Sequence, residues 1–427
     1  MSRRIVLTTL GSLGDLHPFI SIASRLRAHG HEPIIATSPN FRENVTVAGI
    51  AFHPVGPHPD SIMRDLDMDL ARFGHAVMRD TMFILEAAVF PYLQRTYDEL
   101  LPVIDGADLV LSSSLLFSAR FAAERLAVPQ MLVALQPMVF ISAYDPPAVN
   151  PAPWLAPLLL KLGPRATRAV YGRGKRVASR RASALCAFRR QLGLPESAGS
   201  PLFEGQFSRH GTFAVYSSLL AAVQPDYPPH TLVTGFAFYD GSVAPMLEPG
   251  LEAFLAAGSP PLVFTLGSFA VEFAEDFFRI GLEAARALRL RAVALTGPGH
   301  TDAYQTYRSA EIYIGDYAAY SLLFPRALAI IHHGGIGTLG QALRAGRPQL
   351  VVPLLSDQFD NAARAARLGV GRTIPRKRYT TRRLLAEIRR LVSVRAYATR
   401  AREVGAVVAG EQGAERVAEA VDRFPAR

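Results

Sequence analysis

Cysteine is almost absent from this chain of 427 residues, in which Cys186 is the only one. A single thiol excludes a disulfide within the chain and fits a reducing compartment, so we expect a cytoplasmic protein. Long apolar runs are missing as well. A membrane-spanning helix needs about 20 apolar residues, whereas the apolar stretch 131–141 is interrupted by Gln136 and Pro137. The stretch 5–10 is too short for a signal peptide, and we expect it to form the first core strand.

Acidic residues are absent from one long segment. The net charge of the chain is +10, and residues 161–190 hold ten cations and no acid. Apolar residues are interspersed among them, which fits peripheral contact with an anionic membrane, at the inner membrane surface, or with an anionic, lipid-like acceptor. A solvated helical face is the alternative. Nucleic acid is not an expected partner, because a charge block with few aromatic residues identifies no recognition module. The cations are Lys161, Arg165, Arg168, Arg173, Lys175, Arg176, Arg180, Arg181, Arg189 and Arg190.

The order of apolar segments predicts a parallel α/β protein. The chain is too long for one ordinary core, so two domains are expected. Predicted strands are 5–10, 32–37, 51–55, 109–113 and 130–135 in the first half, and 261–266, 291–295, 311–314, 328–331 and 349–352 in the second. Helices are predicted between them, the first at 18–29, entered at Pro18. This alternation indicates two doubly wound, Rossmann-like domains.

The most informative segment is the glycine-rich run 332–338, His-His-Gly-Gly-Ile-Gly-Thr, which follows an apolar strand and opens a helix predicted to start at Thr338. Such a turn presents bare backbone N–H groups and a helix N-terminus, which together bind a diphosphate. His333 adds a donor, and Asp357 and Gln358 after the next strand can hydrogen-bond a polyol. The run therefore predicts a nucleotide-sugar site, against the alternative of a tight turn that binds nothing. A metal site at the adjacent histidines is not expected, because neighbouring side chains diverge.

This spacing resembles the donor-binding signature of the family 1 glycosyltransferases, enzymes of the GT-B fold. The matching positions are His333, Gly335, Thr338, Gly346, Pro348, Asp357 and Gln358. The resemblance implies that Tyr317 stacks on a pyrimidine base, that Ser268 reaches the diphosphate, and that Gln341 takes the place of the family's ribose-binding Glu. Residues implied to bind the donor are Ser268, Tyr317, His333, Gly335, Gly337, Thr338, Gln341, Asp357 and Gln358.

The same resemblance implies a domain plan. Two facing domains are expected to border a cleft: an acceptor domain at 1–238, a linker at 239–258 and a nucleotide-sugar domain at 259–410. The final helix, 411–427, is expected to cross back to the first domain. The implied co-substrate is a UDP- or dTDP-sugar, with no cofactor and no metal.

Residues 11–18, Gly-Ser-Leu-Gly-Asp-Leu-His-Pro, hold the candidate catalytic groups. They follow the first strand, and ligands bind at the carboxyl ends of strands in open α/β sheets. In the resembling family a catalytic base lies three residues before the proline, which is Asp15 here; His17 is the second candidate. The alternatives are a capping role for Asp15 and an exposed first-turn position for His17.

The implied reaction is an inverting transfer of a hexose or deoxyhexose, of glucose or rhamnose type, to a hydroxyl of an apolar acceptor. Residues 264–268, Phe-Thr-Leu-Gly-Ser, and the opening run also resemble rhamnosyltransferases of rhamnolipid synthesis, which favours a lipid, hydroxy-fatty acid or aglycone acceptor. Candidate acceptor residues are Met82, Phe83, Met138 and Phe140. A nucleotide-sugar epimerase and a non-catalytic nucleotide-sugar-binding subunit stay open as alternatives.

Overall fold

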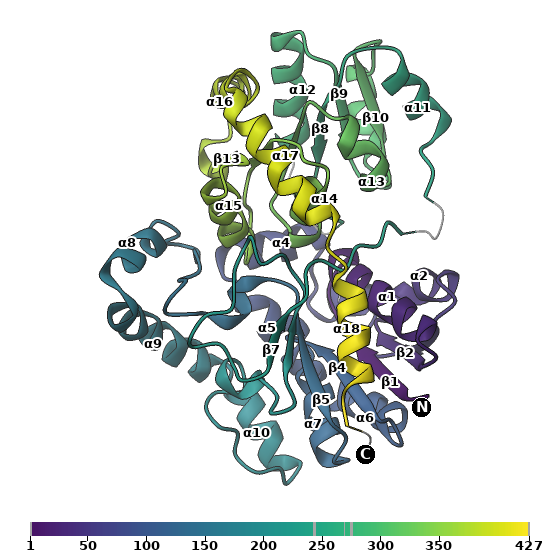
Figure 1. The fold of residues 1–427 in the computed structure, drawn as a ribbon, viewed down its shortest axis with the longest axis vertical. Coiled ribbons are helices and arrows are strands. Elements are labelled where there is room, and N and C mark those ends of the chain that lie inside the picture. Colours follow the sequence, from purple (N-terminus) through teal and green to yellow (C-terminus); the bar gives the residue numbers. More distant parts are fainter. Residues whose placement is uncertain (1, 242–244, 269, 274–275, 426–427) are drawn as a thin grey trace.

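The computed structural model describes residues 2–241, 245–268, 270–273 and 276–425. It contains two sheets with helices on both faces, and every strand pairing within them is parallel (Figure 1). The predicted α/β fold of two doubly wound units is confirmed. Part of the predicted linker, residues 242–244, lies outside the described residues.

The first sheet has the strand order β3-β2-β1-β4-β5-β6-β7. Its strands are β1 (Arg4–Thr8), β2 (Glu32–Thr37), β3 (Ala51–Pro54), β4 (Leu109–Ser113), β5 (Gln130–Ala134), β6 (Thr212–Ala214) and β7 (Thr231–Val233). Its helices are α1 (Leu13–Ala28), α2 (Arg42–Val47), α3 (Pro59–Asp65), α4 (Leu70–Arg79), α5 (Phe83–Ala88), α6 (Leu93–Ile104), α7 (Phe117–Arg125), α8 (Leu155–Leu162), α9 (Pro164–Arg181) and α10 (Ser183–Gln191). The strand order reverses between β1 and β4, so ligands are expected at the carboxyl ends of these strands.

The second sheet has the strand order β10-β9-β8-β11-β12-β13. Its strands are β8 (Leu262–Thr265), β9 (Ala292–Leu295), β10 (Ile312–Gly315), β11 (Ala329–His332), β12 (Gln349–Val351) and β13 (Gly371–Thr373). The remaining helices are α11 (Pro249–Ala256), α12 (Asp276–Leu288), α13 (Tyr320–Leu323), α14 (Ile336–Arg344), α15 (Gln358–Arg367), α16 (Thr381–Ser393), α17 (Arg395–Ala409) and α18 (Gly413–Asp422). In this sheet the strand order reverses between β8 and β11, and β11 leads into the glycine-rich run.

The first helix starts five residues earlier than predicted. It begins at Leu13 because Ser12 and Asp15 form a capping box: Gly14 N–H donates to Ser12 Oγ, and Ser12 N–H donates to the Asp15 carboxylate. Pro18 therefore lies inside the helix. It cannot donate to the Gly14 carbonyl, which is left without its helical partner.

Helix α18 packs against α1 of the first unit and α17 packs with α14 of the second, so these two helices belong to different units (Figure 1). His29 at the end of α1 contacts Asp422 and Glu415 of α18, each at 2.7 Å. These two carboxylates, Asp422 first, raise the pKa of His29. Helix α11 falls within the range predicted as linker and packs on the second sheet through Leu251 and Leu255.

One apolar cluster joins the two units. Leu339 and Leu343 of α14 pack with Tyr216 and Phe140, which belong to the first unit. Helix α4 makes a second bridge, since Met78 packs against the core of the second sheet. The glycine-rich run and the start of α1 are therefore held together by packing on both sides.

Candidate functional site

The glycine-rich run forms a turn that leaves the start of α14 open. Helix α14 begins at Ile336, two residues before the predicted start, and its N-cap is Gly335, which has no side chain to cap the helix. Gly334 has φ +93°, and a Cβ there would lie 2.7 Å from Val351 Cγ1, so both conformation and space require glycine. The first N–H groups of α14 consequently have no side-chain cap, which is the arrangement that binds anions.

His333 is buried beside this turn as a neutral imidazole. Its Nδ1 accepts a hydrogen bond from Gly267 N–H at 3.2 Å. Burial, together with the neighbouring His332, lowers the pKa of His333 to about 3. Since Nδ1 is an acceptor in a neutral ring, the proton is on Nε2, and that nitrogen is a donor.

His332 has a structural position. Its Nδ1 accepts from Gly334 N–H at 3.1 Å, and its Nε2 lies 2.9 Å from Gln349 Oε1 on the neighbouring strand. Burial lowers the pKa of His332 to about 4, so it is neutral as well. Its two bonds fix the backbone at the start of the turn.

Asp357 and Gln358 stand at the start of α15, next to the turn. Gln358 Oε1 accepts from Leu354 N–H and Leu355 N–H at 2.9 and 3.1 Å, which leaves its amide N–H groups as the donors for a ligand. Burial, with the Asp15 carboxylate as the next cause, raises the pKa of Asp357 to about 7. Asp15 belongs to the first unit, so this effect acts across the interface of the two units.

Asn361 connects the turn to Asp357 and was not predicted. Its side-chain amide donates to the Gly334 carbonyl at 2.9 Å and to Asp357 Oδ2 at 2.7 Å. It lies one helical turn after Asp357, so an Asp–Asn spacing of four residues at a helix start was the signal available in the sequence.

Tyr317 and Gln341 meet at Asp240, a second residue that sequence reasoning missed. Gln341 Nε2 donates to Asp240 Oδ1 at 2.9 Å, and the Tyr317 hydroxyl donates to the Asp240 carbonyl at 3.3 Å. Tyr317 is 53% exposed, so its ring is available for stacking. Gln341 is buried and already bound to a carboxylate, whereas the sequence suggested an amide free for the ribose.

Ser268 and Thr338 flank the turn. Ser268 is exposed after β8, directly beyond Gly267, whose N–H binds His333. Thr338 is buried on α14 and its hydroxyl binds the Tyr320 hydroxyl, which also bonds Thr265 Oγ1 at 2.8 Å. The structure therefore brings the nine predicted donor residues to one region, and their roles toward a ligand stay predictions.

Asp15 faces this region from the first unit. Ser12 N–H and the Ser12 hydroxyl both donate to Asp15 Oδ2, at 2.8 and 3.0 Å. Burial raises the pKa of Asp15, while these bonds from Ser12 oppose the rise. A Cβ on Gly337 would lie 3.8 Å from Gly14 Cα, so the first turns of α1 and α14 touch. Asp15 thus has both the capping role and a position at the interface.

His17 points elsewhere. Its ring packs edge-on against Tyr239 with centroids 5.4 Å apart. Burial lowers the pKa of His17 to about 4, although the Asp240 charge acts in the opposite direction. His17 is thus neutral and lies on the side of the site where Tyr317 is found.

The four predicted acceptor residues are scattered. Phe140 is buried and stacks with Tyr227 and Phe207 at centroid distances of 4.0 and 5.6 Å, so it serves the core between the units. Phe83 packs against Phe73 at 5.6 Å, and Met82 packs against the core of the first unit. Met138 is half-buried in the turn after β5. This packing gives the predicted role of Phe140 no structural support.

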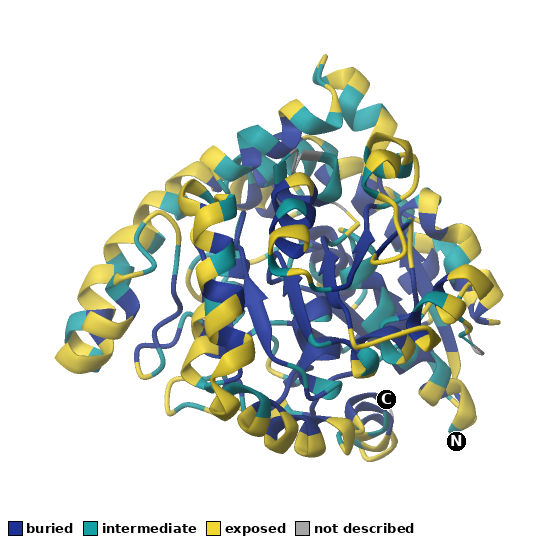
Figure 2. Ribbon diagram, turned by 90° about the horizontal axis from the view of Figure 1, so that it is seen from above, coloured by how far each residue is buried: buried dark blue, intermediate teal, exposed yellow. Residues whose placement is uncertain are grey.

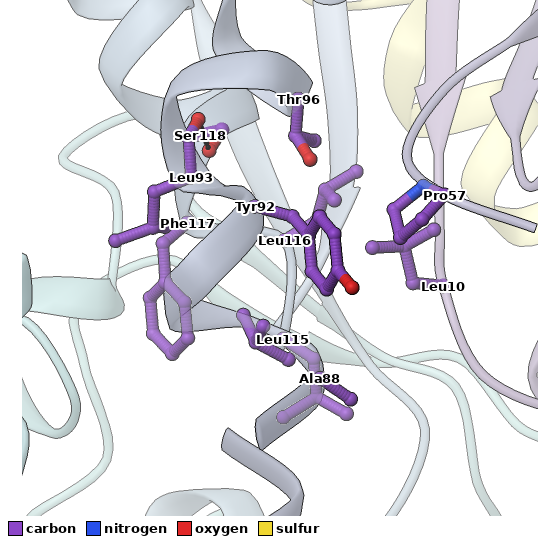
Figure 3. A pocket seen from close by; sticks show the side chains of 11 residues that line it. Leu10, Pro57, Ala88, Tyr92, Leu93, Thr96, Leu115, Leu116, Phe117 and Ser118 are labelled. Atoms are coloured by element: carbon purple, nitrogen blue, oxygen red, sulfur yellow. Dashed lines mark hydrogen bonds between the residues drawn. The ribbon is translucent and has the colours of Figure 1, made fainter. Parts of the chain in front are cut away.

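An apolar pocket lies in the first unit beside the end of β1 (Figure 3). Tyr92 faces Leu10 and Pro57 across it, and none of the four predicted acceptor residues lines it. Its volume is about 10 Å³, room for about one water molecule. Leu10, which lines the pocket, is joined by Gly11 to the capping box that contains Asp15.

Comparison with known proteins matches both halves of the chain. Residues 5–139 match the glycosyltransferase family 28 N-terminal domain, and residues 309–423 match the erythromycin biosynthesis protein CIII-like C-terminal domain. The chain is 33% identical to O-mycaminosyltylonolide 6-deoxyallosyltransferase of Streptomyces fradiae, over 99% of this chain and 97% of that protein. It is 30% identical to the vancomycin aglycone glucosyltransferase of Amycolatopsis orientalis, over 86% of this chain and 85% of the relative.

A sterol 3-beta-glucosyltransferase of Arabidopsis thaliana is 27% identical, over 99% of this chain and 67% of that protein. Two solved structures share the fold. The calicheamicin glycosyltransferase CalG4 superposes with a TM-score of 0.71 at 18% identity, covering 99% of this chain and 98% of its own. The glycosyltransferase VinC, in complex with dTDP, gives 0.65 at 20% identity and 99% coverage of both chains. The chain therefore belongs to the family 1 glycosyltransferases of the GT-B fold and is an enzyme of that type.

Proposed function

We propose that this enzyme transfers a deoxyhexose or hexose from a dTDP- or UDP-sugar to a hydroxyl of an apolar aglycone, with inversion and without a metal. The observation that carries the proposal is the contact between the first turns of α1 and α14. Asp15 follows Gly14 in α1, and the first N–H groups of α14 have no side-chain cap. A proton acceptor and an anion site thus border the same interface.

The chemistry follows from these groups. Both bonds from Ser12 end on Asp15 Oδ2, so Oδ1 is the atom that takes the proton from the acceptor hydroxyl. The hydroxyl oxygen then attacks the anomeric carbon from the face opposite the diphosphate, and the bond to the diphosphate oxygen breaks. The N–H groups of α14 and His333 Nε2–H stabilise the departing anion. Holding donor and acceptor between two units supplies the orientation.

A dTDP-deoxyhexose is the donor we favour. The Streptomyces fradiae relative is named a deoxyallosyltransferase, and the VinC structure holds dTDP. In this chain the Gln341 amide is committed to Asp240, which leaves fewer groups for a ribose diol. The deoxyribose of dTDP lacks the 2′-hydroxyl and therefore needs fewer hydrogen-bonding groups from the protein.

A bulky apolar acceptor fits the names of the relatives, whose substrates include the vancomycin aglycone and sterols. The pocket at Leu10 and Tyr92 is apolar and lies close to Asp15 in the chain, but at about 10 Å³ it is far smaller than such a molecule. We therefore propose that the acceptor enters beside Leu10 and displaces Tyr92, whose hydroxyl bonds Asp65 at 2.6 Å in this conformation.

Ligand-induced stabilisation tests the donor site. We expect dTDP and UDP, but not GDP or ADP, to raise the free energy of unfolding, by about 2.7 kcal/mol at a ligand concentration of 100 times Kd. The measurement is a thermal-shift titration, with Tyr317→Ala as the matched variant that removes the stacking ring. Equal shifts with all four diphosphates, or none, would count against a pyrimidine nucleotide site.

The pair of Gln341 and Asp240 gives a second test. A glutamate at 341 would set a carboxylate about 3 Å from that of Asp240, and like charges so close repel. We expect Gln341→Glu to weaken dTDP binding about tenfold, or 1.4 kcal/mol. Adding Asp240→Asn restores one amide and one carboxylate, so the double variant should recover most of the loss. Isothermal titration of the four proteins checks this, and purely additive losses would show that the pair is not coupled.

A further inference from the structure

Helices α8 and α9 form a hairpin that projects from the first unit, at the left of Figure 1, away from both sheets. Its buried contacts are few: Ala156 and Leu159 on α8 and Thr167 on α9. The Tyr171 hydroxyl fixes the inner side by donating to the Pro147 carbonyl at 2.6 Å. The helices at the left edge of Figure 2 are exposed along most of their length.

Helix α8 carries a second apolar face, which is turned to solvent. Trp154, Leu158 and Leu162 follow one another at intervals of four residues and therefore lie on one side of the helix. They are 67%, 44% and 60% exposed. Their side differs from that of Ala156 and Leu159, which pack inward. A soluble helix normally buries its apolar stripe, so a second, exposed stripe marks an interaction surface.

Most cations of the hairpin and of α10 lack an acidic partner. Three of the ten are paired: Lys175 with Glu204, Arg181 with Asp80 and Glu86, and Arg189 with Glu124. Among the residues that the structure describes, the other seven have no ion pair. These are Lys161, Arg165, Arg168, Arg173, Arg176, Arg180 and Arg190. Helical spacing puts Arg165, Arg176 and Arg180 opposite the buried Thr167, on the outward side of α9.

We propose that the solvent-facing surface formed by α8 and α9 binds the surface of an anionic lipid bilayer. The exposed apolar side chains of the stripe can enter the headgroup region. Lys161 lies between two of its leucines in the sequence, so its ammonium can reach lipid phosphates from the same face. The unpaired arginines of α9 lie alongside and are attracted by a negative surface. Charge complementarity therefore selects anionic lipid over a neutral bilayer.

A second copy of this chain is a poor occupant. A symmetric contact would bring the same unpaired cations of both copies face to face. A bilayer meets the stripe and the cations at once and needs no shaped groove. Among the described residues no helix is both long and apolar enough to cross a membrane, so the proposed contact is with the bilayer surface. This contact brings the enzyme to acceptors that partition into lipid. That consequence rests on the proposed function, whereas the membrane binding itself does not.

Trp154 is the only tryptophan of the chain, so its fluorescence reports on this surface alone. We expect the full chain to co-sediment with vesicles of phosphatidylcholine and phosphatidylglycerol at 3:1, with a blue shift of Trp154 emission. Pure phosphatidylcholine vesicles should bind at least tenfold less. Raising the salt concentration from 50 to 500 mM should release most of the protein, because salt screens surface charge.

Two pairs of variants make the test specific. Lys161→Glu/Arg165→Glu/Arg176→Glu should lower binding at least tenfold, while the same charge change at the exposed arginines of α16, Arg382→Glu/Arg389→Glu/Arg390→Glu, should not. Leu158→Ser/Leu162→Ser keeps the reporter and should abolish the blue shift, unlike Val392→Ser/Val407→Ser elsewhere. Equal effects of both charge variants, a blue shift that follows protein concentration without vesicles, or no binding to anionic vesicles at low salt would each overturn the proposal.

Discussion

Asp15→Asn is expected to lower kcat by about 10²- to 10⁴-fold, the range that a general base contributes, while dTDP still binds. The asparagine oxygen can accept the Ser12 N–H, so the start of α1 should keep its cap. An amide cannot take a proton from the acceptor hydroxyl at neutral pH. Steady-state kinetics with donor and acceptor varied separately measure the change, and a variant that keeps full activity would remove Asp15 from the mechanism.

The pH profile distinguishes a base from a cap. Burial raises the pKa of Asp15, so kcat/KM of the wild type should fall as the pH drops through that raised value, because the protonated carboxyl cannot act as base. Ser12→Ala removes a capping hydroxyl but leaves the carboxylate. It should destabilise α1 by about 1 kcal/mol. The acid limb should persist but move to higher pH, because the lost hydroxyl bond lowers the pKa of Asp15 in the wild type. His17→Asn should leave the acid limb in place, since His17 packs on Tyr239 and is neutral.

Asp357 gives a readout that does not depend on catalysis. Its pKa of about 7 is raised by burial and by the nearby charge of Asp15. In Asp15→Asn that charge is gone, so the pKa of Asp357 should fall. The pH dependence of dTDP-sugar binding would then move to lower pH. This shift is expected only if the Asp15 charge acts on the Asp357 carboxyl in solution.

Long buried segments of this fold were predictable from sequence. Strands β1, β2, β4 and β5 and all strands from β8 to β12 lie where apolar runs predict them, because a parallel strand covered on both faces is nearly all apolar. Strands β6, β7 and β13 were missed. Their positions are set by pairing with a neighbouring strand.

The site residues also divide into those that the sequence predicted and those that it did not. The glycine-rich run, Asp357 and Gln358 are local in sequence, and their chemistry is visible there. Asp240 has no such signal, because its partners Gln341 and Tyr317 come from another part of the chain and meet it only in the folded protein. The early start of α1 was missed because Pro18 suggested a helix start, whereas the Ser12–Asp15 capping box decided it.

Arg364→Ala is expected to be strongly destabilising although Arg364 is not one of the reacting groups. Arg364 on α15 is buried, and its Nε donates to Asp360 Oδ2 at 2.7 Å. Its Nη1 donates to Asp145, which comes from the loop after β5, and to the Leu220 carbonyl at 2.9 Å. Removing the guanidinium leaves the buried Asp360 carboxylate without its cation, while Asp145 keeps Arg367 at 2.9 Å. An uncompensated buried charge costs about 3–5 kcal/mol. Urea unfolding followed by circular dichroism measures the loss.

The matched variant separates charge from packing. Arg364→Met/Asp360→Asn/Asp145→Asn removes all three charges and keeps most of the volume, so it should recover much of the stability lost in Arg364→Ala.

Recovery of activity is a separate question. Asp360 Oδ1 also accepts from Ala148 N–H at 3.0 Å, so the network ties the loop that follows Met138 to the helix that begins at Gln358. If the network orients the two units for catalysis, the triple variant should be stable yet turn over more slowly, with kcat lowered and dTDP affinity unchanged. Stability and kcat recovering together would instead make the network a purely structural contact.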